Sequence, residues 1–212
     1  MTGMSAAKYV PAEADIPALR EAAKGCRGCE LWEPATQVVF SAGNPNAKLM
    51  LVGEQPGDVE DQRGLPFVGP AGQLLQRALA DAAIATSDVY VTNAVKHFRF
   101  TVKGKRRIHA TPQVSHIKAC RPWLDAELRQ VQPGLVVLLG ATAAKALLGN
   151  DFRITRDRGH LIEVEMAGAP LRLLATAHPS AVLRTTEGPE RAQAYQDLVT
   201  DLTTAAALAR PT

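Results

Sequence analysis

A cationic segment that ends in a histidine carries the clearest chemical potential in this sequence. Residues 103–109 read Lys-Gly-Lys-Arg-Arg-Ile-His, so four cations closely precede His109. The glycine and the short length favour a polar loop over a basic helix. Cations at this density attract phosphate and disfavour a protonated imidazole, which would leave His109 neutral with a free lone pair. Such an imidazole beside a polyanion can be a nucleophile or a base; the alternative is a solvated basic loop in which the histidine has no role.

Three further polar clusters each follow a predicted strand. They are residues 53–58 (Gly-Glu-Gln-Pro-Gly-Asp), residues 93–97 (Asn-Ala-Val-Lys-His) and residues 178–180 (His-Pro-Ser). In open α/β sheets the ligand crevice lies beyond the carboxyl ends of the strands. We therefore expect the three clusters to share one pocket, with the 103–109 segment close to the second cluster.

The elements that must position these residues alternate between strand and helix. Such alternation predicts an α/β fold with a central, mostly parallel four-stranded sheet that helices cover on both faces. Thr111 is the expected cap of the helix at 113–131, with Pro112 in its first turn. An antiparallel ribbon is expected from the run 161–165, an Ala-Gly turn and the strand that follows. The expected strands are 48–53, 88–95, 135–140 and 171–177, and the expected helices are 71–83, 113–131, 141–148 and 189–208.

Composition restricts the class of protein. The 212 residues suit a single domain spanning 1–212, and the net charge of +3 is mild, so a nucleic-acid surface must come from local clustering. No apolar run approaches the roughly 20 residues that span a bilayer. The first ten residues lack a cationic segment before an apolar core, which argues against a secretory signal. We expect a cytoplasmic monomer with no membrane partner.

The three cysteines suggest a metal site. Cys26 and Cys29 form a Cys-x-x-Cys pair, and Cys120 stands alone. A cytosolic compartment argues against disulfides, and the pair does not open a helix after a strand as a thioredoxin-like motif would. Three thiolates need a fourth ligand, for which His97 is the first candidate and His116 the second. Spacing alone ranks zinc above iron–sulfur; the alternatives are coincidence for the pair and an ordinary loop residue for His97.

The expected pocket contains side chains suited to a nucleobase. Glu54 and Gln55 supply a carboxylate and an amide directly after a strand. Asn93 carries both a donor and an acceptor, as reading the edge of a pyrimidine requires. Phe67, in a Gly/Pro-rich loop, can stack on a base. The alternatives are a polar turn for the first pair, a strand-end cap for Asn93 and a core position for Phe67.

Taken together, these motifs resemble the uracil-DNA glycosylase superfamily, in particular its iron–sulfur branch. Six elements occur in the family's order, which is far more specific than any one of them. The resemblance extends over nearly the whole chain. Its elements are Cys26-x-x-Cys29, Gly53-Glu54-Gln55-Pro56-Gly57, Gly64-Leu65-Pro66-Phe67-Val68-Gly69-Pro70-Ala71-Gly72, Thr92-Asn93-Ala94-Val95-Lys96, Cys120 and His178-Pro179-Ser180.

The resemblance implies roles for the pocket residues and for the DNA contacts. Phe67 would stack on a flipped uracil, Asn93 would read its edge, and His178 would hydrogen-bond its carbonyl. The backbone and side chain of Gln55 would lie against the same base. Residues 178–184 would enter the minor groove, with Val182 and Leu183 as an apolar wedge and Arg184 at a flanking phosphate. The implied DNA contacts are Lys105, Arg106, Arg107, Ser180, Leu183 and Arg184.

The resemblance also changes the expected metal. The iron–sulfur branch carries a 4Fe-4S cluster, so a cluster with a structural role now ranks above zinc. Its implied ligands are Cys26, Cys29, Cys120 and His97. Most relatives have a cysteine where this chain has His97, which makes the histidine the least certain ligand.

The segment before Thr111 departs from the hydrolytic relatives, which have a short proline-rich loop there. Together with Gln55, the longer insert looks like the X-type class, whose members cut the glycosidic bond and become attached to the sugar through a loop histidine. Flipping the uridine out of the DNA stack exposes its sugar carbon C1′. Stabilisation of the departing uracil makes that carbon cation-like. Neutral His109 could then capture C1′ in place of water. Glu54 could hold the other imidazole nitrogen and accept the proton. Asp58 would position water or support the loop.

Two alternatives remain open. The first is an ordinary hydrolytic uracil-DNA glycosylase with turnover, in which the insert only binds phosphate. The second is a non-catalytic module that recognises uracil or damaged DNA. The insert argues against the first, and Glu54, Gln55, Asn93 and His178 argue against the second. The implied partner is uracil-containing DNA, single-stranded first and double-stranded as a further option, on the nucleoid of a bacterial-type cell.

Overall fold

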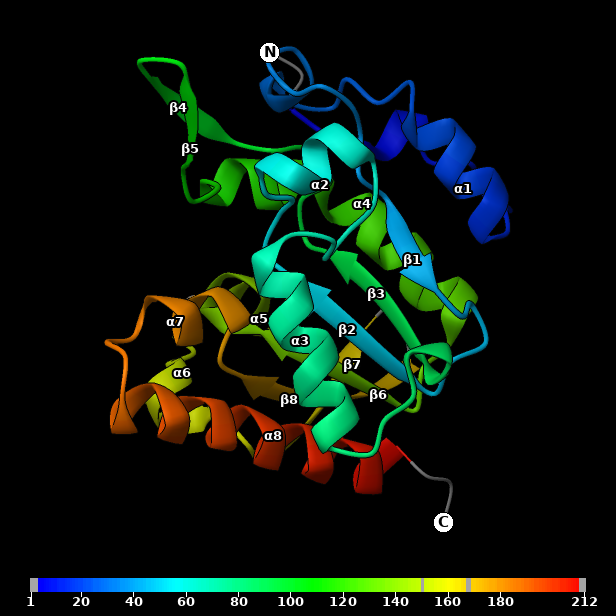
Figure 1. Ribbon diagram of the computed structural model, residues 1–212. Helices are drawn as coiled ribbons and strands as arrows, with labels where there is room; N and C mark the ends of the chain where they lie inside the picture. Colours follow the sequence, from blue (N-terminus) through cyan, green and yellow to red (C-terminus); the bar gives the residue numbers. More distant parts are fainter. Residues whose placement is uncertain (1–3, 150, 167–168, 210–212) are drawn as a thin grey trace.

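A six-stranded sheet with helices on both faces forms the body of the protein (Figure 1). The computed structural model describes residues 4–149, 151–166 and 169–209. The strand order is β1-β3-β2-β6-β8-β7; the four middle strands run parallel, and β1 and β7 are antiparallel to their neighbours. The strands of this sheet are β1 (Ser41–Gly43), β2 (Leu49–Gly53), β3 (Val89–Asn93), β6 (Leu135–Leu139), β7 (Leu161–Met166) and β8 (Ala169–Thr176).

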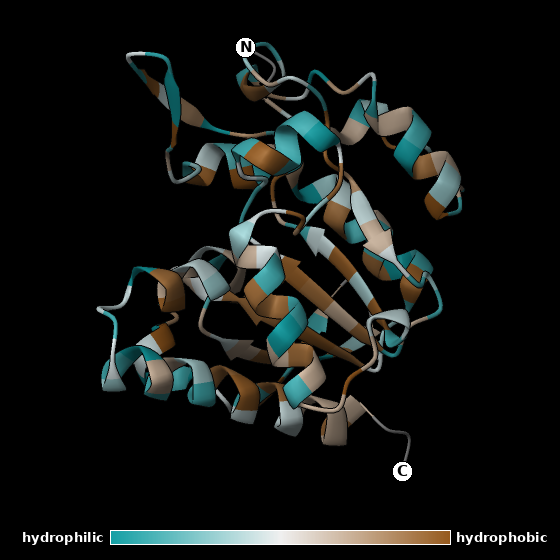
Figure 2. Cartoon of the chain, viewed as in Figure 1, coloured by the Kyte–Doolittle hydropathy of each residue, from teal (hydrophilic) through white to brown (hydrophobic). Residues whose placement is uncertain are grey.

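The two faces of the sheet bury separate apolar cores, as the alternation of side chains along a strand requires. In β2, Met50 and Val52 pack toward helices α1, α4 and α5, whereas Leu49 and Leu51 pack toward α3 and α8. Because both faces are covered, β2 and β6 are apolar at nearly every position. Figure 2 shows these central strands in brown. The helices are α1 (Ile16–Ala23), α2 (Asp58–Arg63), α3 (Pro70–Asp81), α4 (Val114–Val131), α5 (Gly140–Leu148), α6 (Ile154–Asp157), α7 (Pro179–Arg184) and α8 (Pro189–Ala209).

The predicted α/β fold, with four parallel strands at its centre, is confirmed. The ribbon expected from 161–165 is confirmed as β7 pairing with β8, while its Ala167-Gly168 turn lies outside the described residues. The sheet is wider than predicted because β1 adds a strand at the other edge. β1 contains only Ser-Ala-Gly, which is too short and too weakly apolar to show alternation.

Two local predictions were wrong. The segment 103–109 is not a loop, because most of it belongs to an antiparallel hairpin of β4 (Phe100–Lys103) and β5 (Arg106–His109), with Phe100 opposite His109. Gly104 takes a positive φ of 61° at the turn, as a two-residue hairpin turn favours. Thr111 is not the cap of α4, which begins at Val114 behind its cap Gln113, two residues after Thr111. Over the described ranges, no helix is long and apolar enough to cross a membrane.

Candidate active site at the carboxyl ends of the strands

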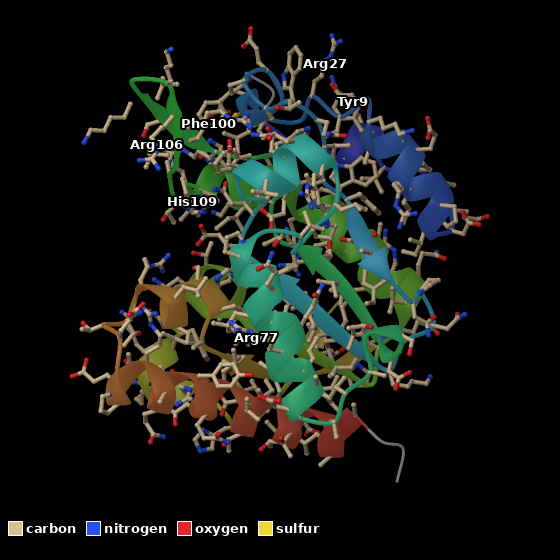
Figure 3. The ribbon with its side chains drawn as sticks, viewed as in Figure 1. Tyr9, Arg27, Arg77, Phe100, Arg106 and His109 are labelled. Atoms are coloured by element: carbon tan, nitrogen blue, oxygen red, sulfur yellow. The ribbon has the colours of Figure 1, made fainter. Side chains whose placement is uncertain are left out.

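A cavity of about 820 Å³ lies at the carboxyl ends of the parallel strands. Its lining comes from segments far apart in the sequence: Glu54 and Gln55 after β2, Asn93 at the end of β3, His109 at the end of β5 and His178 after β8. The three polar clusters and the hairpin thus meet in one place. Figure 3 shows His109 at the base of the hairpin, nearer the sheet than Arg106.

Phe67 is held in the cavity by an unusual backbone conformation. Its φ is +54°, in the left-handed region that non-glycine residues rarely adopt. Two glycines make room for it: a Cβ on Gly72 would lie 1.8 Å from the Phe67 carbonyl oxygen, and a Cβ on Gly53 would lie 2.6 Å from its ring. The same Cβ on Gly53 would lie 2.3 Å from Asn93 Oδ1. The close approach of ring and amide therefore depends on glycine at position 53.

Asn93 presents an unsatisfied acceptor. Its side chain is buried, and Oδ1 is the one buried side-chain polar atom in the described part of the chain that lacks a hydrogen-bond partner. Leaving such an atom unpaired costs about 1–3 kcal/mol. Lys96 Nζ donates to the Asn93 backbone oxygen at 3.0 Å, which fixes the main chain and not the amide. A ligand with an N–H group would remove the penalty.

His178 is a neutral hydrogen-bond donor. The backbone N–H of Ser180 donates to His178 Nδ1 at 3.1 Å. Since Nδ1 accepts, the proton of the neutral ring must be on Nε2. Burial lowers the pKa of His178 to about 4, against the opposing effect of the Glu54 carboxylate, so the neutral form prevails at physiological pH.

His109 and Glu54 face each other across the cavity mouth. His109 Nε2 lies 3.2 Å from Glu54 Oε1, and 48% of the histidine side chain is exposed to incoming ligand. The second oxygen, Oε2, accepts a hydrogen bond from the hydroxyl of Thr142. Burial raises the pKa of Glu54, but the hydrogen bonds from His109 and Thr142 together outweigh it and leave that pKa below its ordinary value. The carboxylate is therefore ionised and aimed at the ring.

Arg107 anchors the hairpin to α2. Its Nε lies 2.6 Å from Asp58 Oδ1, and its Nη1 lies 2.6 Å from Asp61 Oδ2. The Asp61 side chain is fully buried, and its carboxylate also accepts from the Thr36 backbone N–H. The guanidinium lies over the Phe100 ring at 5.0 Å. Asp58 thus supports the hairpin, the second of the two roles expected for it, and the guanidinium expected at a DNA phosphate is engaged by two carboxylates.

Gln55 binds the two residues that flank the hairpin at its base. Its Nε2 donates to the backbone oxygens of Arg99 and Ala110, each at 3.1 Å, and its Oε1 accepts from the Arg99 N–H at 3.0 Å. The polar atoms of its side chain therefore hold the hairpin, and a contact with a base is left to its backbone. Of the other residues expected at DNA, Ser180 and Arg184 line the cavity, Lys105 and Arg106 are exposed on the hairpin, and Leu183 packs at the edge of the core.

Thr142, at the start of α5, was missed by the sequence analysis. It comes three residues after the end of β6, so the rule that polar residues after strands line the crevice would have found it. Glu60 was missed too. Its carboxylate accepts from Gly57 and Gly69, which ties the loop after β2 to the loop that carries Phe67.

The three cysteines are buried thiols on one side of the core. Burial, with smaller contributions from the thiols of Cys29 and Cys26, raises the pKa of Cys120 to about 12 against the opposing effect of Lys96, which indicates that the three thiols interact. N–H groups point at two of the sulfurs: the Lys96 backbone donates to Cys120, and Trp123 Nε1 donates to Cys26, each at 3.3 Å. Buried thiols with N–H donors suit an iron–sulfur cluster.

His97 and His116 are the two candidates for the fourth ligand of the cluster. His97 is buried, and no hydrogen bond of its side chain is seen over the described ranges. His116 is committed elsewhere, because its Nε2 lies 2.6 Å from Glu30 Oε1 and its Nδ1 accepts from the Gln113 N–H. This leaves His97 as the better candidate of the two. No group of three or more His, Cys, Asp or Glu side chains in the described part of the chain is arranged to hold a metal ion.

Comparisons with known proteins match most of the chain. A family model described as uracil DNA glycosylase superfamily matches residues 40–203. The Type-4 uracil-DNA glycosylase of Archaeoglobus fulgidus is 36% identical over 162 residues, which cover 74% of this chain and 78% of the relative. That of Pyrobaculum aerophilum is 35% identical over 174 residues, covering 80% and 85%. That of Thermotoga maritima is 34% identical over 179 residues, covering 84% and 88%.

Proposed function

The chain belongs to the uracil DNA glycosylase superfamily, and on that premise we propose that it recognises uracil in DNA, cleaves the N-glycosidic bond and captures the sugar C1′ on His109. The first two steps rest on the relatives, which are named as Type-4 uracil-DNA glycosylases. The third step distinguishes the X-type class. It rests on one observation: an anchored hairpin brings His109 to the mouth of the cavity, where its ring meets Glu54.

Recognition of uracil follows from the hydrogen-bonding groups of the cavity. The N3–H of uracil would donate to the unsatisfied Oδ1 of Asn93, and His178 Nε2–H would donate to a uracil carbonyl, while Phe67 stacks on the ring. Cytosine has no N3–H, so it would leave Oδ1 unpaired at a cost of about 1–3 kcal/mol. These hydrogen bonds select uracil over cytosine; thymine presents the same N3–H and carbonyl groups, so they do not exclude it.

Bond cleavage and capture can be written as one balanced sequence. The C1′–N1 bond breaks with its electron pair on uracil, whose carbonyl charge is stabilised by the neutral donor His178. The sugar becomes cation-like at C1′. The imidazole nitrogen of His109 that Glu54 does not hold donates its lone pair to C1′ and forms a C–N bond. The proton on the other nitrogen passes to the Glu54 carboxylate, and the product is a stable protein–DNA adduct.

Ordinary hydrolysis with turnover is the second candidate. In that reaction water takes the place of His109 at C1′, and the hairpin only binds DNA phosphates. Two contacts favour capture. Gln55 fixes the base of the hairpin next to His109, and Arg107 fixes β5 two residues before His109, whereas a phosphate-binding segment requires only exposed cations. The contact between Glu54 and His109 is likewise not needed if the hairpin only binds DNA phosphates.

We also propose that Cys26, Cys29, Cys120 and His97 would hold a 4Fe-4S cluster. The cluster would supply structural cross-linking between the N-terminal segment and α4 and would take no part in the reaction. We further propose that residues 1–212 act as one domain, as a cytoplasmic monomer, on single-stranded DNA first.

A denaturing gel tests capture directly. The protein is mixed with a single-stranded oligonucleotide that contains one uracil, boiled in detergent and separated, and free uracil is measured in parallel. We expect a shifted band with the wild type, none with His109→Ala, and an unchanged band with the control His160→Ala, which alters an exposed histidine outside the cavity. Free uracil without a shifted band in the wild type would establish turnover instead.

A further inference from the structure

We propose that Thr142 is a positioning residue that holds the Glu54 carboxylate in the orientation in which its other oxygen faces His109. The inference rests on the proposed function, because it assigns a partner to the Glu54–His109 pair. Thr142 itself would contact neither the uracil nor the sugar.

The geometry assigns one partner to each carboxylate oxygen. Thr142 Oγ1 donates to Glu54 Oε2, and His109 Nε2 lies 3.2 Å from Oε1. A carboxylate on its own rotates freely about its terminal bond, since that torsion is broad. A fixed donor on Oε2 removes that freedom and leaves Oε1 toward the imidazole. Within the described chain, no side chain apart from Thr142 and His109 donates a hydrogen bond to Glu54.

Both ends of this contact are rigid. Glu54 directly follows β2, and its backbone oxygen accepts from the Val95 N–H at 3.0 Å. Thr142 lies in the first turn of α5, and the next two residues, Ala143 and Ala144, are fully buried against the sheet. A β-branched side chain has few χ1 rotamers in a helix. The hydroxyl is therefore presented at a fixed point of the cavity wall.

The hydroxyl has no structural task that would explain it otherwise. The cap of α5 is Leu139, and it makes no side-chain hydrogen bond there. Thr142 lines the cavity and is not part of either core. Its one hydrogen-bond partner among the described residues is the Glu54 carboxylate.

Loss of the hydroxyl should change both the rate and the pH dependence of capture. The hydrogen bond from Thr142 helps to lower the pKa of Glu54, so its removal raises that pKa. Glu54 accepts a proton only when ionised. The acid limb of the pH profile must therefore move to higher pH in Thr142→Val, and capture should slow about tenfold, the usual effect of one hydrogen bond to a charged group.

The experiment measures single-turnover adduct formation on a uracil oligonucleotide from pH 5 to 9. Wild type is compared with Thr142→Val, Thr142→Ser and the control Thr200→Val, which removes a hydroxyl from an exposed residue of α8 outside the cavity. We expect slower capture and a shifted acid limb in Thr142→Val alone, with the serine variant restoring both. Thermal unfolding of each variant is measured alongside.

Two results would overturn the inference. One is a wild-type rate and profile in Thr142→Val. The other is a slower rate with an unshifted acid limb, because that would mark a merely structural residue. Failure of the proposed function is distinguishable, since it would show as the absence of an adduct in the wild type.

Discussion

Removing Arg107 should separate capture from cleavage. In Arg107→Leu the hairpin loses both ion pairs to α2, while Asn93, Phe67 and His178 lie on other elements and keep their places. We therefore expect uracil to be released at close to the normal rate and the adduct to form much more slowly. The ratio of adduct to free uracil is the quantity that changes.

The magnitude follows from the two carboxylates. Breaking a buried ion pair by removing one partner costs about 3–5 kcal/mol, because a buried charge is left alone. Asp61 is fully buried, but the Arg107 side chain is 22% exposed and the Thr36 N–H still serves the carboxylate. Both facts place the cost below that range, at about 2–3 kcal/mol. If this free energy is lost entirely from the docking of the hairpin on α2, the rate of capture falls by roughly 30- to 150-fold.

The assay is a single-turnover time course in which shifted band and free uracil are quantified from the same samples. Arg106→Leu is the matched control, because it removes the same charge from the next residue, which is exposed and makes no ion pair over the described ranges. Thermal unfolding reports any global loss of stability. Equal effects of the two variants would refute the anchoring role and leave only the contribution of charge to DNA binding.

Two further predictions concern His178 and the cysteines. Because burial lowers the pKa of His178 to about 4, the ring stays neutral on acidification until near that pH, where protonation of Nδ1 breaks the bond from the Ser180 N–H that orients the Nε2–H donor. The affinity of His109→Ala for uracil DNA should therefore hold through pH 6.5 and fall as pH approaches 4; a loss centred near 6.5 would contradict this. For the cysteines, we expect anaerobically purified protein to contain iron and sulfide with visible absorption, Cys120→Ser to lose both and His97→Cys to keep them. A colourless protein loaded with zinc would refute the cluster.

The fold was largely predictable because its signals are local. The strands β2, β3, β6 and β8 are apolar runs that end in glycine or polar residues, and helices follow them with clear periodicity. Errors occurred where the decisive contacts are distant in sequence. The hairpin at 100–109 depends on the ion pairs of Arg107 with carboxylates in α2 and on the hydrogen bonds of Gln55 to the two residues that flank the hairpin at its base. No pattern within the segment reveals those partners.

The position of the candidate site was predictable from the sequence, but the contacts of its side chains were predictable only in part. The position of polar clusters after strands was enough to expect Glu54, Asn93 and His178 around one cavity. The direction of each side chain could not be predicted from that position. Gln55 directs its amide toward the hairpin, and Arg107 directs its guanidinium toward α2. Side-chain direction follows from which buried partners remain unsatisfied, and that balance is set by the whole fold.

The hairpin is held at its base by Gln55 and along β5 by Arg107, whereas its tip projects beyond both contacts. His109 pairs with Phe100 at the base, Val102 pairs with the anchored Arg107, and Gly104 lies at the tip. Displacement of the tip by a DNA backbone moves the imidazole very little. The tip can therefore adapt to strands of different shape, and its sequence can change, without altering where the His109 ring lies.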